Sequence, residues 1–297
     1  MMYRLSSFAE AIGLDVVRDG EFAVTGKLST PLDLICVPLR SAAYVEEVND
    51  NRRVAAVITT PEIAEQLEDR LAVATSENPN SAHLEIHALL AEAKAAERQA
   101  QSNRIDPSAV IDGSARIADY GVTIGAGARI GANVSLAAGV TIEEGTVLHP
   151  GCALGVPGFN TGMVSGRLRI VQPLGGVRIG EHCELLANCT IASAIFGGET
   201  TFGPEVMVDN LVYVAHDVQI GRRVQICALV SILGRTIIGD DAYIGPSAVV
   251  KNGLTLGARA RINIGAVVTQ DVAEGASVSG NFAIPHDRFL NHLRTIR

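Results

Sequence analysis

Aliphatic residues recur at every sixth position through the middle and the last part of the chain. One run extends from Ile124 to Leu154, and a second extends from Phe202 to Val268. A smaller residue, most often valine or alanine, lies two positions before nearly all of them. A period of six with two inward positions matches neither the 3.6-residue period of a helix nor the alternation of an ordinary strand. It is typical of a parallel β-helix of hexapeptide repeats, in which three hexads form one triangular coil.

The same register excludes two other interpretations. A sandwich of short strands would show turn signals at intervals of roughly 8 to 12 residues in place of a fixed hexad. The segment "GAGARIG" has closely spaced glycines, but no βαβ pattern surrounds it, so it is not a dinucleotide-binding loop. We therefore predict a mainly β protein with a left-handed parallel β-helix, interrupted over 155–176 and slipping register once around "IFGGET".

The two flanks of the repeat follow other patterns. Residues 1–103 alternate short apolar strands, such as "LDLICVPL" and "RVAAVITT", with helical segments. The alanine- and leucine-rich stretch that follows Pro79 predicts one long helix opened by Asn80 or Ser81. We expect a small α/β domain with a connector helix over 1–103, the β-helix over 104–280, and a short basic amphipathic helix over 281–297.

Charge and cysteine content narrow the class of function. The formal net charge is -8 and the sequence pI is near 5.4, which argues against nucleic-acid binding, because that requires a basic face for the phosphates. No apolar run reaches the roughly 20 residues of a membrane span, and no signal-peptide pattern is present, so we expect a cytoplasmic protein. The 5 cysteines show no metal-binding spacing and are interpreted as buried thiols.

One histidine stands out within the repeat. In "VMVDNLVYVAHDVQIG", His216 follows the inward Val214 by two residues, so it lies at an outward corner of a coil. With 18 residues in three hexads, Gly198, Gly234 and Asn252 are its expected neighbours in adjacent coils. Side-chain-free neighbours leave a slot with accessible backbone amides beside the imidazole. We expect no metal there, because His216 is the only histidine between His182 and His286 in the sequence.

These residues resemble the family of UDP-3-O-acylglucosamine N-acyltransferases of lipid A synthesis. The similarity rests on the α/β N-terminus, "IDPSAVI", "GVPGFN" and above all "VDNLVYVAHDVQIG", which matches the family's D-N-x-x-x-x-A-H-[ND]-V-x-I-G. By this resemblance His216 is the general base, Gly234 supplies an oxyanion-hole amide, and Asp209 and Asn210 lie close by. The resemblance also implies a homotrimer with active sites between subunits, a nucleotide-sugar-binding N-terminal domain, and no bound cofactor.

The chain departs from the family pattern at several substrate positions. After the Asn-Gly pair, Asn252 and Gly253, the family usually has a histidine where this chain has a leucine. The family's uracil clamp, a phenylalanine and a tyrosine, aligns with Cys36 and Tyr44. We predict Asp209, Asn210, Asn252, Gly253 and Tyr44 as substrate-binding residues.

Three functions therefore stay open from the sequence. The first is transfer of a long acyl chain from acyl carrier protein to a nucleotide-linked amino sugar. The second is acetylation of such a sugar from acetyl coenzyme A, for a surface polysaccharide. The third is a non-catalytic β-helical scaffold. His216 and its neighbouring glycines argue against this third function. An imidazole is suited to accept a proton from the attacking amine near neutral pH, which favours the two enzymes.

Overall fold

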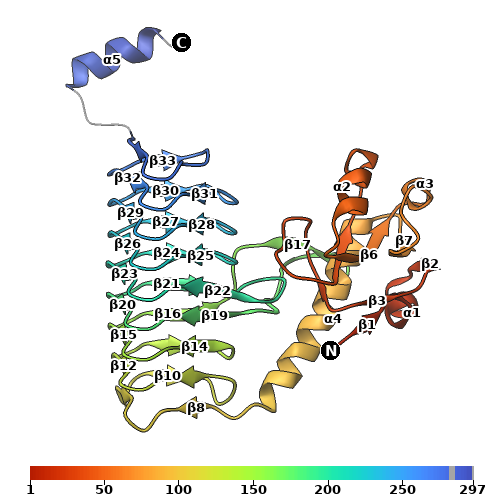
Figure 1. Ribbon diagram of the computed structural model, residues 1–297, viewed down its shortest axis with the longest axis horizontal. Coiled ribbons are helices and arrows are strands. Elements are labelled where there is room, and N and C mark those ends of the chain that lie inside the picture. The colour runs from red at the N-terminus through yellow and green to blue at the C-terminus, as the bar shows by residue number, and fades with distance from the viewer. Residues whose placement is uncertain (281–284, 296–297) are drawn as a thin grey trace.

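The computed structural model describes residues 1–280 and 285–295. Two parts make up the chain: a small α/β domain at the N-terminus and a tall triangular coil that follows it (Figure 1). A short helix, α5 (His286–Thr295), lies beyond the top of the coil (Figure 1). The ends of the predicted C-terminal helix, 281–284 and 296–297, lie outside the described residues.

The N-terminal domain is built on a five-stranded sheet in the order β2-β7-β6-β5-β4. Only β2 is antiparallel to its neighbour. The strands are β2 (Asp15–Arg18), β4 (Val24–Thr25), β5 (Ile35–Pro38), β6 (Val54–Thr59) and β7 (Ala72–Thr75), and a separate antiparallel pair comprises β1 (Tyr3–Arg4) and β3 (Glu21–Phe22). The helices are η1 (Leu5–Phe8), α1 (Ala9–Ile12), η2 (Ala42–Tyr44), α2 (Val45–Asp50), α3 (Pro61–Ala64) and α4 (Pro79–Gln99).

Helix α4 connects the two parts of the chain, as the sequence predicts, but it begins earlier than expected. Its N-cap is Asn78, whose side-chain oxygen accepts a hydrogen bond from the Ser81 amide at 3.2 Å. Proline is favoured at the first helical position, where its missing N–H costs nothing, and Pro79 takes that position. The expectation that Asn80 or Ser81 opens the helix is therefore wrong by about one to two residues.

The coil is a left-handed parallel β-helix with three flat faces, each a parallel sheet of two- to four-residue strands. The face that carries the candidate site has the order β10 (Arg116–Ile117), β13 (Ser135–Leu136), β16 (Ala153–Val156), β21 (Thr190–Ala192), β24 (Tyr213–Val214), β27 (Ser231–Ile232), β30 (Val249–Val250) and β33 (Val267–Val268). The second face comprises β8 (Arg104–Ile105), β11 (Thr123–Ile124), β14 (Val140–Ile142), β19 (Gly176–Ile179), β22 (Glu199–Phe202), β25 (Gln219–Ile220), β28 (Ile237–Ile238) and β31 (Thr255–Leu256). The third comprises β9 (Val110–Ile111), β12 (Arg129–Ile130), β15 (Val147–Leu148), β20 (Glu184–Leu185), β23 (Met207–Val208), β26 (Gln225–Ile226), β29 (Tyr243–Ile244), β32 (Arg261–Ile262) and β34 (Ser277–Val278).

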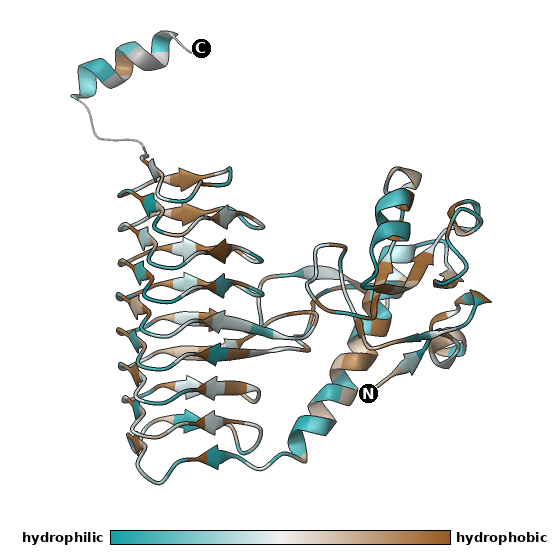
Figure 2. Cartoon of the chain, viewed as in Figure 1, coloured by the Kyte–Doolittle hydropathy of each residue, from teal (hydrophilic) through white to brown (hydrophobic). Residues whose placement is uncertain are grey.

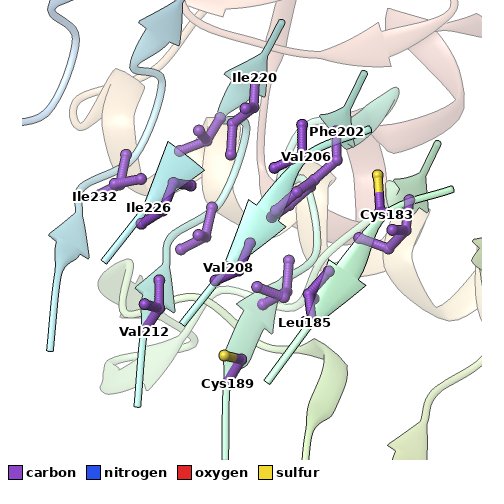
Figure 3. Close-up of a cluster of buried hydrophobic side chains, with 14 of the residues drawn as sticks. Cys183, Leu185, Cys189, Phe202, Val206, Val208, Val212, Ile220, Ile226 and Ile232 are labelled. Carbon is purple, nitrogen blue, oxygen red and sulfur yellow. The ribbon is translucent and has the colours of Figure 1, made fainter. Parts of the chain in front are cut away.

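The predicted inward positions fill the coil. Stacked isoleucine, leucine and valine side chains occupy its interior in coil after coil, and Cys183 and Cys189 are buried among them (Figure 3). Apolar residues accordingly recur in the strands along the whole height of the coil, with more polar residues at its corners (Figure 2). Burial of a large aliphatic side chain contributes on the order of 2 kcal/mol, so these stacks are the main stabilising term. Of the cysteines predicted to be buried, Cys227 is only half-buried.

Two insertions leave the coil and reach the N-terminal domain. The first is the predicted interruption, which forms an antiparallel hairpin of β17 (Thr161–Val164) and β18 (Arg167–Ile170) that contacts α4. The second follows β21, where Thr190 pairs with Tyr213, a step of 23 residues in place of 18. This second insertion, residues 193–198, is named the seam loop below. Both insertions extend toward the N-terminal domain in Figure 1.

Candidate functional site

His216 lies at the corner that follows β24, on the side of the coil that faces the N-terminal domain. Its Nδ1 lies 2.7 Å from Oδ2 of Asp217, and the two side chains are 15% and 18% exposed. An ionised carboxylate only accepts hydrogen bonds, so Nδ1 carries the proton and donates it. The lone pair of the imidazole is therefore on Nε2, which has no hydrogen-bond partner among the described residues.

Asp217 is held firmly in this position by the fold. Its backbone has φ +61°, its amide donates to Thr200 Oγ1 at 2.9 Å, and its Oδ1 accepts from the Ile195 amide at 3.1 Å. Each carboxylate oxygen thus has one donor, and the seam loop supplies one of them. Because Asp217 is fixed, the ring orientation and the tautomer of His216 are fixed as well. This role of Asp217 does not follow from the sequence motif, although the position of Asp217 next to His216 was the available signal.

Two glycines allow the imidazole to lie against backbone. A Cβ built on Gly234 would lie 2.6 Å from Cε1 and 2.7 Å from Nε2 of His216. A Cβ built on Gly158, in the loop between β16 and β17, would lie 2.9 Å from Cδ2 of the same ring. No side chain fits at either position without displacing the ring. Gly234 is buried, and its amide donates to no acceptor in the part of the chain that the structure describes.

The predicted column of neighbours is correct for the coils that follow His216 and wrong for the coil that precedes it. The Arg235 amide donates to the His216 carbonyl and the Gly253 amide donates to the Gly234 carbonyl, both at 2.9 Å. Gly234, Asn252 and Gly253 thus follow His216 in successive coils. Below it, the longer step places Ser193 next in the column, since Ile191 pairs with Val214. Gly198 lies instead before β22, where its carbonyl accepts from the Gly176 amide at 2.9 Å.

Asp209 and Asn210 lie at a different corner, before β24 rather than after it. Oδ1 of Asp209 accepts from the backbone and side-chain nitrogens of Asn210 at 2.7 and 2.8 Å, and Oδ2 accepts from the Ala228 amide at 3.2 Å. Asn210 Oδ1 accepts from the Ala187 amide at 3.1 Å. Within one chain these side chains hold a corner of the coil together. Their closeness to His216 in an assembled protein stays a prediction.

The two residues that align with the family's uracil clamp differ in burial. Tyr44 is 53% exposed at the end of η2, whereas Cys36 is fully buried in the sheet of the N-terminal domain. Burial raises the pKa of the Cys36 thiol, and the Cys36 carbonyl accepts a hydrogen bond from His83 at 3.0 Å. A buried side chain cannot stack on a base, so of these two aligned residues Tyr44 alone stays a prediction for substrate contact.

Two buried histidines of α4 join the N-terminal domain to the coil. The rings of His83 and His87 lie beside the ring of Phe196 in the seam loop. Their centroids are 6.0 and 5.3 Å, respectively, from the centroid of Phe196. His87 accepts from Thr25 Oγ1 through Nδ1 and donates to the Gln172 carbonyl through Nε2, both at 2.7 Å. Burial lowers the pKa of His83 to about 3 and lowers that of His87 as well.

The described residues contain no cluster of histidine, cysteine or acidic side chains that could hold a metal ion. Within the described ranges, no helix is both long and apolar enough to cross a bilayer.

Comparisons with known proteins agree with this architecture. Residues 121–155 match the family model "Bacterial transferase hexapeptide (six repeats)". The UDP-3-O-acylglucosamine N-acyltransferase of Caulobacter sp. (strain K31) is 36% identical over 144 residues, which cover 48% of this chain and 42% of that protein. The protein of the same name from Delftia acidovorans is 32% identical over 136 residues, which cover 46% of this chain and 40% of that one.

Among solved structures, LpxA from Acinetobacter baumannii has a TM-score of 0.49 at 19% identity, covering 64% of this chain and 77% of that one. The chain spans less than half of the length of the two N-acyltransferases named above. The resemblance predicted from the sequence is confirmed: the chain carries the hexapeptide repeats of bacterial transferases and is similar, over about half of its length, to UDP-3-O-acylglucosamine N-acyltransferases.

Proposed function

We propose that this protein transfers an acyl group from a thioester to the amine of a nucleotide-linked amino sugar, with His216 as general base. The observation that carries the proposal is the arrangement of His216 between Asp217 and Gly234. Nδ1 is hydrogen-bonded to a fixed carboxylate, and Nε2, which has no partner among the described residues, lies beside the backbone of Gly234. The names of the similar proteins support the acceptor, since they are N-acyltransferases of UDP-3-O-acylglucosamine.

The proposed reaction proceeds in two steps, in which His216 first accepts a proton and then returns it. The amine nitrogen attacks the thioester carbonyl carbon, and Nε2 of His216 takes one proton from that nitrogen as the new C–N bond forms. The C–S bond then breaks, and the imidazolium returns the proton to the leaving thiolate. Asp217 stabilises the positive charge that His216 carries between the two steps, because its carboxylate accepts from Nδ1 throughout.

The amide of Gly234 is the proposed donor to the oxyanion. Negative charge gathers on the thioester oxygen during attack, and a preorganised backbone amide there contributes about 3 kcal/mol to transition-state stabilisation. The Gly234 amide is suited to this because it is buried beside the imidazole and has no acceptor among the described residues. Glycine is required at this position, since any Cβ would collide with Cε1 and Nε2 of His216.

The donor in this proposal is a thioester of acyl carrier protein or of coenzyme A, with no resident cofactor. Direct transfer requires no acyl-cysteine intermediate. Cys152, Cys183 and Cys189 are buried inside the coil, and burial raises the pKa of Cys183 to about 11. A thiol with such a pKa is almost entirely protonated at neutral pH and is a poor nucleophile.

The assembly in this proposal is a homotrimer that works in the cytoplasm, where both kinds of thioester donor are made. A trimer gives a role to the Asp209–Asn210 corner, because packing of three coils side by side brings corners of neighbouring chains together. In this arrangement the site of one chain is completed by its neighbour, and Asn252, Gly253 and Tyr44 contact the sugar nucleotide.

The direct test is mass spectrometry of the products. The purified protein is incubated with UDP-linked amino sugars and with acetyl coenzyme A or acyl carrier proteins that bear chains of several lengths. We expect an N-acylated sugar nucleotide with wild-type protein and a strongly reduced amount with His216→Ala. An acetylated product alone identifies an acetyltransferase. Absence of any product with every donor contradicts the proposal and favours a scaffold.

A further inference from the structure

The seam loop reaches the corner of the proposed base through one residue and α4 through the next. The Ile195 amide donates to Oδ1 of Asp217 at 3.1 Å. The ring of the following residue, Phe196, lies beside two histidines of α4. Its centroid is 6.0 Å from that of His83 and 5.3 Å from that of His87. Two consecutive residues therefore connect α4 to the carboxylate that orients the proposed base.

The side chains of Ile195 and Phe196 pack outside the interior of the coil. Both are buried in a small apolar cluster with Val171, which follows the hairpin, and Leu84 of α4 packs against this cluster. The cluster is separate from the apolar stack inside the coil. The Ile195 carbonyl accepts from the Leu174 amide at 2.8 Å. The place of the Ile195 amide therefore depends on how α4 and the hairpin pack together (Figure 1), and not on the hexad repeat.

The two histidines of α4 are themselves fixed by buried hydrogen bonds. His87 accepts from Thr25 Oγ1 and donates to the Gln172 carbonyl, both at 2.7 Å. His83 donates to the Cys36 carbonyl at 3.0 Å. Rotation of either imidazole would leave buried polar groups unpaired, which is costly. The ring of the seam loop therefore packs against a rigid surface.

The Ile195 amide has a specific role at Asp217. Thr200 Oγ1 accepts from the Asp217 backbone amide and so fixes only the main chain there. Among the described residues the carboxylate itself has two donors, the Ile195 amide at Oδ1 and His216 Nδ1 at Oδ2. Without the Ile195 amide, the carboxylate would be held only by the ring that it has to orient. It could then turn to another staggered position about its Cα–Cβ bond.

We propose that Phe196 is a positioning residue for the reaction at His216. Its ring, packed on the histidines of α4, keeps the Ile195 amide on the Asp217 carboxylate. That carboxylate keeps the proton of His216 on Nδ1 and the lone pair on Nε2. The inference rests on the proposed function and adds a requirement to it: the base is correctly oriented only while the seam loop and α4 are packed together.

The experiment compares three variants of the full chain. Phe196→Ala removes the ring, and Phe196→Leu keeps much of the buried volume without the flat ring faces. Phe8→Ala is the matched control, because Phe8 is also buried but its ring lies in the N-terminal domain, beside Tyr3 and Phe22. Circular dichroism and the thermal midpoint verify that each variant is folded. If Phe196→Ala does not fold, Phe196→Leu takes its place in every measurement, with a smaller expected effect.

The first measurement requires no turnover. Nuclear magnetic resonance of protein labelled with ¹⁵N-histidine distinguishes a protonated ring nitrogen from an unprotonated one, at a pH where the imidazole is neutral. The His216 signals are identified by their loss in His216→Gln. We expect the proton on Nδ1 in wild type and in Phe8→Ala. In Phe196→Ala we expect a mixture of the two tautomers, because the carboxylate no longer selects one of them.

The second measurement is the rate of acyl transfer in a single turnover. Phe196→Ala should lower this rate about tenfold, the lower end for groups that orient a functional histidine. KM for the sugar nucleotide should stay within about twofold of wild type, since the ring touches no substrate. Asp217→Asn already removes the link to His216, so adding Phe196→Ala to it should change the rate by less than about twofold.

The outcomes separate this proposal from the proposed function. An unchanged tautomer in folded Phe196→Ala, an equal effect of Phe8→Ala, or full multiplication of the two effects in the double variant overturns the positioning role. If the tautomer changes as expected but wild type transfers no acyl group, the proposed function fails while the positioning role stands. If wild type transfers an acyl group and the rate does not depend on Phe196, the positioning role fails alone.

Discussion

Two polar corners of the same coil, one on each side of β24, differ in what they leave unpaired. At the corner of Asp209 and Asn210, the carboxylate and amide oxygens accept from backbone and side-chain nitrogens of adjacent coils. At the corner of His216, the Asp217 carboxylate is equally engaged, but Nε2 of His216 and the amide of Gly234 have no partner in the described part of the chain.

This difference separates polar residues that build the fold from those that are available for chemistry. A parallel β-helix must satisfy the backbone groups at every corner, and asparagine and aspartate do this well because their short side chains reach neighbouring amides. Polar groups that stay unpaired inside a protein cost free energy, so their persistence at one corner indicates a ligand. The sequence motif spans both corners, and only the hydrogen bonds tell them apart.

The strongest test of this comparison is His216→Ala. We expect kcat to fall roughly 10²- to 10⁴-fold, the usual contribution of a general base. Stability should change by less than about 1 kcal/mol, because the ring lies at a corner against glycine backbone and leaves no core cavity. Steady-state kinetics under saturating donor and acceptor, with thermal denaturation alongside, measure both quantities. Wild-type turnover with chemistry shown to be rate-limiting removes His216 from the mechanism.

Asp217→Asn should have the next largest effect. The amide cannot fix the tautomer of His216 as the carboxylate does, so we expect kcat to fall about 10- to 100-fold, the typical size for a group that orients a functional histidine. KM for the sugar nucleotide should stay within about twofold of wild type, since Asp217 lies behind the ring. A loss confined to KM, with kcat unchanged, shows that Asp217 binds substrate and does not position His216.

The buried histidines of the seam predict a dependence of stability on pH. The folded-state pKa of His83 is lowered to about 3, below the ordinary value of 6.5, and that of His87 is lowered too. The unfolded chain therefore binds more protons between these values, so stability is full above about pH 6.5 and declines as the pH falls toward 3. The limiting slope is about 1.4 kcal/mol per pH unit for each histidine. Denaturant titrations of wild type and His83→Gln measure it, and the variant should show the smaller slope.

Asp209→Ala should act mainly on stability. It removes acceptors for the Asn210 and Ala228 nitrogens, and we expect the free energy of unfolding to fall by about 1 to 3 kcal/mol. Turnover per folded molecule should stay within about threefold of wild type if this corner only supports the coil. Urea titration combined with kinetics separates the two effects. A stable protein with a large loss of kcat places the corner in the active site of a neighbouring chain.

Much of the fold follows from sequence because its signal is local and repeated. The hexad register identified the inward residues, the three-sided coil and the outward position of His216. It failed at Gly198, because the seam loop lengthens one coil to 23 residues and shifts everything below it in the column. The helix start was misplaced for a different, local reason, since Asn78 caps the helix and Pro79 takes its first position.

Local sequence therefore specifies the repeat, because each hexad sets its own inward and corner residues through size and polarity. Which polar groups meet across distant segments depends instead on tertiary packing. Asp217 is held by the seam loop, Gly158 reaches His216 from the hairpin loop, and Phe196 of the seam loop lies against His83 and His87 of α4. These contacts join residues tens to hundreds of positions apart, and no local pattern encodes such distances, because they depend on how the insertions and the N-terminal domain dock on the coil.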